Sequence, residues 1–435
     1  MIEPAAARPA SPWAHRNFRL LFTANAADMA GTAVAPIALS FAMLDLTGSL
    51  TDLGLVVGAR SLGLVVLLLV GGVLADRFRR SRVLAWSNVV NGLVQTAVAV
   101  LVGTGTGSVP TLVVLSLVAG GADAMSFPAI QGVLPQTVPR PLLQRANALN
   151  SSGRNTVQLV GLVGGAALVA FVGPAWGLAL DAASCLVAAV LFSRLRLPRR
   201  ERGAGSTMLA DLREGWSAFT AHQWLWVTVL SFMVLMIAFS ATVTVLGPAV
   251  ADQTIGRAQW GWVLGAEASG VLAATLLLSR GHARTRRLWQ GMVGILLPVG
   301  LIVALGIAPR LWILLVTALA SGAGIGVFVV TWDTTLQANV AEEHLSRVAS
   351  FDAFGSILMT PIGQAIAGPL AAAFGLAATL VGAGVLVVVA VLGALAVPAV
   401  RHLPPPRLDE GPTDPGGPGG PGGPSPSAPE PVATP

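Results

Sequence analysis

Residues 377–400 read AATLVGAGVLVVVAVLGALAVPAV, a run of 24 residues without a charged side chain. A helix needs about 20 apolar residues to cross the roughly 30 Å hydrocarbon core of a bilayer. Residues 162–172 are equally continuous in apolar character, without the alternation of a lipid-facing barrel strand. Because only helices and closed barrels satisfy every backbone polar group in lipid, these runs predict membrane-spanning helices.

The composition of the whole chain supports the same prediction. Of its 435 residues, 54% are hydrophobic and 11% charged, whereas a soluble domain carries about 25% charged residues. Cys185 is the single cysteine, which excludes an intrachain disulfide. We predict an all-α polytopic membrane protein with twelve transmembrane helices, near residues 18–44, 50–75, 83–103, 109–133, 147–173, 176–195, 223–250, 259–280, 286–306, 311–337, 348–374 and 377–399.

Arginine placement predicts the orientation of these helices. The chain has 26 basic residues, all arginine, and 22 of them fall on one side of the membrane if both termini lie on that side. The opposite loops hold only Arg257 and Arg310. Since basic residues accumulate in cytoplasmic loops, both termini are expected in the cytoplasm, with the chain in the inner (plasma) membrane.

A charged linker divides the chain into similar parts. Its apolar residues Leu209, Leu212, Trp216 and Phe219 lie on one helical face and predict an amphipathic helix on the membrane surface. The predicted organisation is a cytoplasmic segment 1–17, a six-helix half 18–195, the linker 196–222, a second six-helix half 223–400 and a Pro/Gly-rich tail 401–435 that cannot bury apolar surface.

The two halves read as copies of each other. The pattern L-x3-V-x4-L-x-R-x7-G at residues 134–153 recurs 202 positions later at residues 336–355. Gly120 and Gly322 hold the same offset. Internal repeats of this kind are typical of secondary transporters.

Residues 71–82, GGVLADRFRRSR, lie at the cytoplasmic end of the second predicted span. They resemble the loop signature of the major facilitator superfamily, in which Gly72, Asp76, Arg77 and Arg80 match and Arg79 replaces the usual glycine. The resemblance implies the major facilitator fold. It also implies a gating role for these residues, in which Asp76 accepts hydrogen bonds from a helix N-terminus of the other half and the arginines hold neighbouring helix ends.

The likeness extends over most of residues 16–400. Residues 127–129 (FPA), 145–150 (RANALN) and 173–176 (GPAW) are similar to the enterobactin-exporter-like branch of the superfamily, which implies a bacterial efflux carrier. Two features depart from drug/proton antiporters: the fourth span lacks their arginine, and Leu162 follows Gly161 where they often have proline.

Ionisable side chains at membrane depth are the strongest candidates for function, because each is costly there unless paired. Asp28, Asp123 and Glu267 are the candidate proton-coupling residues, with static pairing as the alternative, and Arg60 could neutralise one of these acids. The resemblance places further candidates in the substrate cavity: Asn25, Met125, Phe239, Thr242, Trp332 and Gln364.

These features favour a transporter that exports a small organic molecule by proton-coupled alternating access. Burial favours the neutral form of a carboxyl group, so Asp28 or Asp123 could bind a proton outside and release it inside. An acidic, partly aromatic cavity suggests an amphipathic or cationic substrate. The alternatives are an uptake symporter or facilitator of the same fold, and a non-transporting sensor that works through its tail.

Enzymatic function finds no support, because neither G-x-S-x-G nor H-E-x-x-H occurs in the sequence. We expect no cofactor, no metal and no nucleic-acid partner. The expected partners are the lipid bilayer, protons and a small-molecule substrate, with the protein acting as a monomer.

Overall fold

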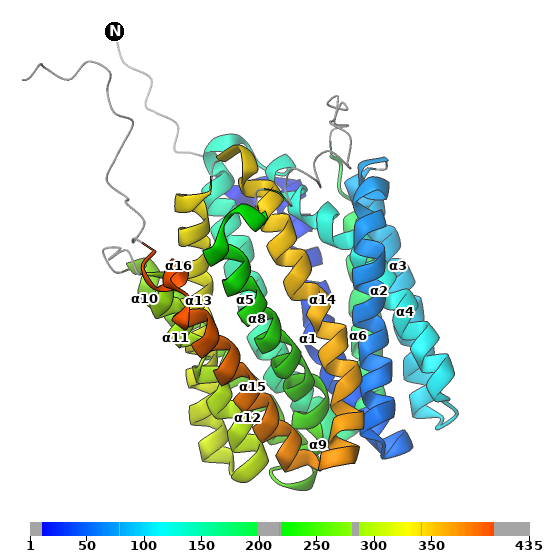
Figure 1. Ribbon diagram of the computed structural model, residues 1–435. Helices are drawn as coiled ribbons and strands as arrows, with labels where there is room; N and C mark the ends of the chain where they lie inside the picture. The colour runs from blue at the N-terminus through cyan, green and yellow to red at the C-terminus, as the bar shows by residue number, and fades with distance from the viewer. Residues whose placement is uncertain are drawn as a thin grey trace, which may run out of the picture.

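The computed structural model describes residues 11–77, 79–197, 217, 219–280, 287–340 and 342–403. In this part of the chain twelve helical segments are long and apolar enough to span a membrane, which confirms the predicted all-α polytopic fold. Both described ends of the chain lie at one end of the helix bundle, which we call the terminal face (Figure 1). The opposite end, where α1 passes to α2, is the distal face.

The first group of helices runs from residue 16 to residue 193. Within it α2 packs along α4, α3 along α6, and α1 against both α5 and α6. Gly173 separates α5 from α6 with a φ of 109°, a backbone conformation that glycine adopts readily in a tight turn. The members are α1 (Arg16–Thr47), α2 (Leu50–Arg77), α3 (Arg80–Gly103), α4 (Val109–Gln131), α5 (Leu143–Val172) and α6 (Pro174–Ser193).

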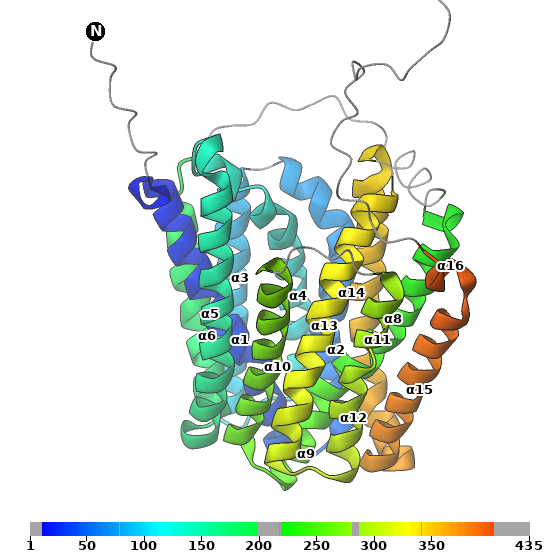
Figure 2. The same cartoon turned by 90° about the vertical axis from the view of Figure 1, so that its left-hand side faces the viewer.

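The second group follows from residue 223. Here α10 packs along α13, α14 along α8, and α12 against α13 and α15 (Figure 2). Two spans are interrupted: α8, a π-helical turn η4 and α9 form one, and α11 with α12 form another. The members are α8 (Gln223–Ala241), η4 (Thr242–Leu246), α9 (Gly247–Gln253), α10 (Arg257–Arg280), α11 (Leu288–Gly294), α12 (Leu297–Ile307), α13 (Leu311–Asn339), α14 (Glu342–Phe374), α15 (Leu376–Ala396) and α16 (Pro398–Arg401).

Glycine contacts show that the two groups repeat the same packing. In the first group Gly120 of α4 lies against the backbone carbonyl of Arg60 in α2, too close for any side chain. In the second group Gly322 of α13 lies in the same way against the carbonyl of Glu267 in α10. Arg60 and Glu267 each come ten residues after the first residue of their helix. They therefore occupy equivalent places.

The two groups meet along α2 with α14 and along α5 with α10. Gly54 and Gly58 of α2 bring that helix against the backbone of Gln364 and Pro361. Gly261 of α10 packs in the same manner on α5. Gly54 with Gly58 and Gly261 with Gly265 form G-x-x-x-G pairs, which allow such close approach of helix backbones.

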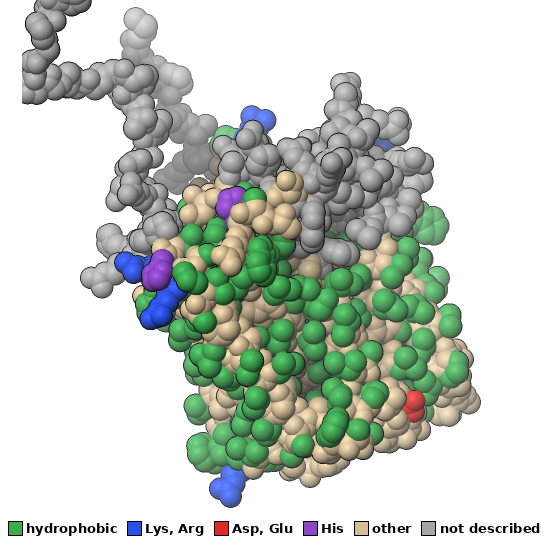
Figure 3. Space-filling model, in the orientation of Figure 1, with side chains coloured by type: hydrophobic (Ala, Val, Ile, Leu, Met, Phe, Trp, Pro, Cys, Tyr) green, Lys and Arg blue, Asp and Glu red, His purple; other side chains and the backbone are tan. Residues whose placement is uncertain are grey.

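The surface matches a membrane setting. Hydrophobic side chains cover the flank of the bundle, and the visible charged ones lie near its ends (Figure 3). Several large apolar side chains are more than half exposed, among them Trp86, Phe171 and Leu277. An apolar surface of this extent is stable in lipid and not in water.

Some predictions fall on residues whose placement is not described. The side chains of Gly72, Asp76 and Arg77, nearly all of the linker that holds the predicted amphipathic helix, and the tail from residue 404 lie outside the described residues.

Candidate functional site

A cavity of about 500 Å³ lies between the two groups of helices. The first group contributes residues of α1 and α5, and the second group contributes residues of η4, α9 and α10. Glu267 is the one ionisable side chain among the described lining residues. The lining consists of Thr32, Ala33, Pro36, Ile37, Ser40, Asn155, Gln158, Leu159, Leu162, Val243, Thr244, Pro248, Trp260, Leu264, Glu267, Ala268, Val271, Leu272 and Thr275.

Both sides of this cavity carry a proline: Pro36 lies inside α1, and Pro248 lies in the first turn of α9. Pro248 has no N–H to donate, so it leaves the carbonyl of Thr244 without its usual helical partner. The Ser40 hydroxyl of α1 lies 2.8 Å from that carbonyl oxygen and 2.8 Å from the carbonyl oxygen of Pro36, and it can donate to either. The π-helical turn at residues 242–246 thus offers a hydrogen bond between the two groups, and such turns are frequent at functional sites.

The half of α5 that begins at the terminal face is polar and exposed. Ser151, Ser152, Asn155, Thr156 and Gln158 are all exposed, and two of them line the cavity. Polar side chains at this depth are costly in lipid and are found facing water or protein. This part of α5 is therefore suited to the wall of a water-filled cavity.

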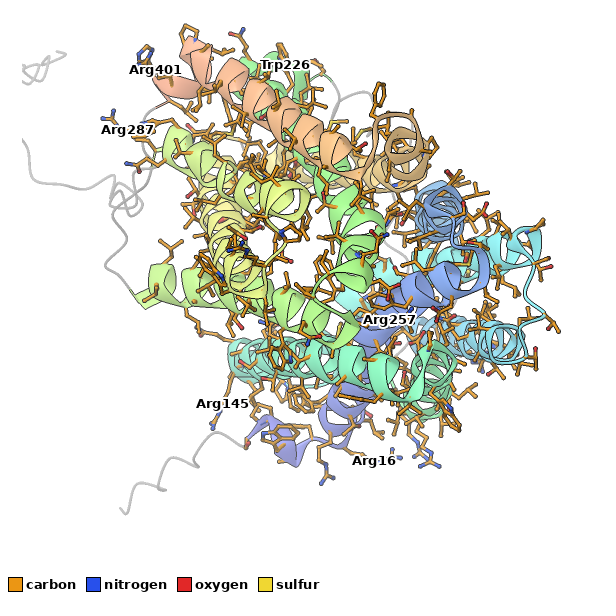
Figure 4. All side chains as sticks on the ribbon, turned by 90° about the horizontal axis from the view of Figure 1, so that it is seen from below. Arg16, Arg145, Trp226, Arg257, Arg287 and Arg401 are labelled. Carbon is orange, nitrogen blue, oxygen red and sulfur yellow. The ribbon has the colours of Figure 1, made fainter. Side chains whose placement is uncertain are left out.

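At the distal face a charged bridge joins the two groups. Arg257, the first residue of α10, holds the carboxylate of Asp45 on α1 with two hydrogen bonds of 2.5 and 2.8 Å. Its Nε donates to Asp252 at 2.6 Å, and its guanidinium lies 4.9 Å from the centre of the Phe41 ring. Figure 4, seen from the distal face, shows Arg257 where the two groups meet.

A second set of charges lies inside the first group. Arg60 of α2 forms an ion pair with Asp123 of α4 at 3.0 Å, and Asn91 of α3 donates to the other carboxylate oxygen at 2.7 Å. The side chains of Arg60 and Asp123 are 25% and 33% exposed. The sequence left open which acid Arg60 neutralises, and in the structure it is Asp123.

Asp181 of α6 lies in the same region and is 1% exposed. It accepts hydrogen bonds from Gln95 and from the Cys185 thiol. Gly31 of α1 contacts it so closely that a side chain at residue 31 would overlap its carboxylate. Asp181 was not among the candidate residues of the sequence analysis, because the buried Gln95 that binds it comes from another helix, α3, and carries no sequence signal.

Asp28 of α1 completes this charged cluster, within electrostatic range of Asp123, Asp181 and Arg60. No described residue donates a hydrogen bond to it. Three carboxyl groups thus lie within electrostatic range of one guanidinium, and Asp123 is the one that pairs with it. A further acceptor in this region, the Oδ1 of Asn91, is also buried without a partner among the described residues. The cluster therefore has more hydrogen-bond acceptors than donors. Protons or cations can balance such a site.

The predicted cavity residues are dispersed in the structure, and none of these six lines the cavity between the groups. Asn25 donates to Asn150 of α5 at 3.0 Å, and the buried Thr242 hydroxyl donates to the Ala238 carbonyl at 2.7 Å. Gln364 is buried where α14 meets α2. Met125 and Phe239 are partly buried and pack against the apolar cores.

Trp332 belongs to an aromatic cluster in the second group. It stacks on Phe328 at 6.1 Å and meets Trp224 edge-on at 5.9 Å. Its indole N–H donates to Asp352 at 2.8 Å. Packing of α8, α13 and α14 therefore holds Trp332 in a buried position.

Of the four gating-loop residues, Arg80 has a described side chain. It donates to the carbonyl of Gly132, the residue that ends α4, at 2.7 Å. A basic side chain at a helix C-terminus is favourable because it meets the unpaired carbonyls there. The contact agrees with the expectation that these arginines hold neighbouring helix ends.

Known proteins similar to this chain are transporters. The Multidrug efflux pump Tap of Mycolicibacterium fortuitum is 26% identical over 400 residues, which cover 88% of this chain and 96% of Tap. The Enterobactin exporter EntS of Escherichia coli is 26% identical over 394 residues, covering 89% of this chain and 93% of EntS.

The fold has close counterparts among solved structures. A bacterial homologue of the human lysosomal transporter Spinster, in an inward-facing and unoccupied conformation, superposes with a TM-score of 0.70 at 16% identity. The match covers 91% of this chain and 98% of that one. At this identity the likeness concerns the fold.

The sequence model of the transmembrane secretion effectors matches residues 7–323. The match covers well over half of the chain and includes the gating-loop motif and all six helices of the first group. The chain therefore belongs to the transmembrane secretion effector family of the major facilitator superfamily, and it is a membrane transporter and not an enzyme.

Proposed function

We propose that this protein exports a small organic molecule by alternating access and that the cavity between the two groups of helices holds the substrate. The observation that carries this proposal is the position of the cavity, bounded by α1 and α5 on one side and by η4, α9 and α10 on the other. Substrate sites of such carriers lie at the interface of two repeats, near the middle of the bilayer. Export is the activity named for Tap and EntS.

The two ends of the interface differ in a way that suits alternating access. At the distal face the Arg257–Asp45 bridge and the glycine contacts of α2 with α14 join the groups. Toward the terminal face the polar side of α5 is exposed. With the terminal face in the cytoplasm, as the arginine distribution favours, this conformation receives substrate from inside the cell.

The charged cluster of the first group is our candidate for proton coupling. Asp28, Asp123 and Asp181 lie within electrostatic range of the guanidinium of Arg60, so protonation of one acid changes the net charge of a site within the bundle. Helix α1 connects this cluster to the cavity: Asp28 and Gly31 lie at the cluster, and Thr32 and Pro36 line the cavity. A shift of α1 upon protonation would therefore change the shape of the substrate site.

The test uses purified protein in vesicles with an imposed proton gradient. Wild type should move substrate against its gradient and release protons on the opposite side, whereas Asp28→Asn and Asp123→Asn should bind substrate without coupling it to protons. Asp333→Asn is the matched control, because Asp333 is an exposed acid of α13 outside the cluster. Coupling that survives in both cluster variants would contradict this assignment.

The same vesicles test the direction of transport. Protein oriented with its terminal face outward should accumulate substrate inside the vesicle when the lumen is acidic. Accumulation by the opposite orientation under a reversed gradient would instead indicate uptake by symport.

A further inference from the structure

Glu267 stands at a place where the first group of helices has an ion pair. In the first group Asp123, three residues after Gly120, pairs with Arg60. In the second group the residue three positions after Gly322 is Ile325. Glu267 therefore occupies the place of Arg60 without a charged partner at the place of Asp123.

The remaining polar support of that ion pair is also missing in the second group. Gly103 of α3 packs on Ala175, and Gly306 of α12 packs in the same way on Ala377. Asn91, which donates to Asp123, lies twelve residues before Gly103. The residue twelve positions before Gly306 is Gly294, so Gly294 is the equivalent of Asn91 in the second group. Glycine offers no side-chain donor. Among the described residues, Glu267 has no hydrogen bond or ion pair.

Glu267 is a lining residue of the cavity between the groups, in contrast to Arg60. Around it the lining is largely apolar, with Leu264 and Val271 one helical turn away on either side. The amides of Asn155 and Gln158 and several hydroxyls supply the remaining polarity. Trp260 of the same lining is fully buried, and its indole N–H has no acceptor among the described residues.

An unpaired carboxylate in this setting needs compensation. At membrane depth a charged side chain is stable when it is paired, protonated or in contact with water. In a cavity, a bound cation can supply the missing charge, and partial removal of water strengthens the attraction. Apolar and aromatic walls favour a cation that carries apolar groups, since burial of those groups contributes the larger part of binding.

We propose that Glu267 is the cation-recognition group of this cavity and that the transported molecule is an amphipathic organic cation. The proposal rests on the proposed export function and specifies its substrate class. The positive group of the ligand pairs with Glu267, in the role that the charged partner Asp123 has for Arg60 in the first group. The amides of Asn155 and Gln158, facing from α5, can bind polar atoms elsewhere on the ligand.

Two probes of the same shape and opposite charge test the proposal: tetraphenylphosphonium and tetraphenylborate. Binding is measured on purified protein by equilibrium dialysis. Wild type should bind the cation at least tenfold more tightly than the anion. Glu267→Gln should lose most of that preference, whereas Glu267→Asp should keep part of it. Asp333→Asn, with its exposed acid on α13, should bind both probes as wild type does.

A second variant supplies the missing partner from the protein itself. Ile325→Arg places a guanidinium on α13 at the position equivalent to Asp123. The variant should fold with an unchanged or higher melting temperature and lose binding of tetraphenylphosphonium. Retained cation binding by folded Ile325→Arg, or an unchanged preference in Glu267→Gln, would overturn the proposal.

Failure of this inference is distinguishable from failure of the proposed function. If wild type exports neutral or anionic molecules and Glu267→Gln exports them equally well, the cation site is wrong and export stands. The opposite result is also possible: wild type transports no probe under any gradient, but its preference for the cation still depends on Glu267. In that case the cation site is supported and the proposed export function is wrong.

Discussion

The first and second groups of helices share a packing scheme but bury different chemistry. Where α2 crosses α4, the first group holds an ion pair and a supporting amide. Where α10 crosses α13, the second group holds a single acid, Glu267, that lines the cavity. The two groups thus repeat the packing of their helix backbones but not the side chains at equivalent positions. The charged cluster of the first group is suited to coupling, and the lone acid of the second group to ligand recognition.

The largest effect is expected when one partner of the ion pair is removed. Asp123→Leu leaves Arg60 without its carboxylate inside the bundle. Breaking a buried ion pair costs about 3–5 kcal/mol, and partial exposure of these side chains places the expected loss toward the lower value. Thermal melting of the purified protein in detergent measures this change.

Its control is the double variant Arg60→Met with Asp123→Leu. Replacement of both charges by apolar side chains should restore most of the lost stability, because no unpaired charge remains. The double variant should still fail to couple transport to protons. Recovery of coupling would show that the pair has a structural role alone.

The equivalence of the two groups predicts matched effects at two glycines. Gly120→Val and Gly322→Val each place a side chain against a helix carbonyl. Overpacking of this kind costs about 1–3 kcal/mol, so both variants should lose similar stability. Gly164→Val is the control, since that glycine has no neighbouring atoms within contact distance. A loss confined to one of the two variants would break the comparison between the groups.

A smaller effect is expected at the distal bridge. Arg257→Gln removes the bond between α1 and α10, a partly exposed pair worth about 1 kcal/mol. The population open at the distal face should rise about fivefold. Labelling by a membrane-impermeant maleimide at Val243→Cys, in a Cys185→Ser background, reports this opening. Arg310→Gln changes the other arginine of the distal face and should leave the labelling rate unaltered.

The smallest effect is expected from truncation after Leu403. The removed segment is composed largely of proline and glycine and carries no run able to cross a membrane. Transport rates in vesicles should stay within the error of wild type. A lost cellular effect with unchanged flux would instead support the sensor function that uses the tail.

Much of the fold could be predicted because membrane insertion depends on local properties of the chain. A run such as residues 377–400 is long and apolar enough to span a bilayer whatever surrounds it. The 202-residue offset was also visible between Gly120 and Gly322, since the pattern at residues 134–153 recurs with the same offset at residues 336–355.

The charged positions were found by the same local reasoning. Asp28, Asp123 and Glu267 stand out because an acid within an apolar run is rare and costly. Their depth in the membrane follows from helix rise alone. What each acid contacts does not follow from depth.

Tertiary structure decided those contacts. The close crossing of α2 and α4 lets Arg60 pair with Asp123, and the packing of α3 on α6 lets Gln95 donate a hydrogen bond to Asp181. The equivalence of Arg60 and Glu267 was hidden in the sequence: Gly120 follows Arg60 by 60 positions, whereas Gly322 follows Glu267 by 55. The sequence by itself determined how many helices cross the membrane and which charges they carry, because both are properties of single segments. Which charges are paired and which line a cavity was decided by how helices from distant parts of the chain pack.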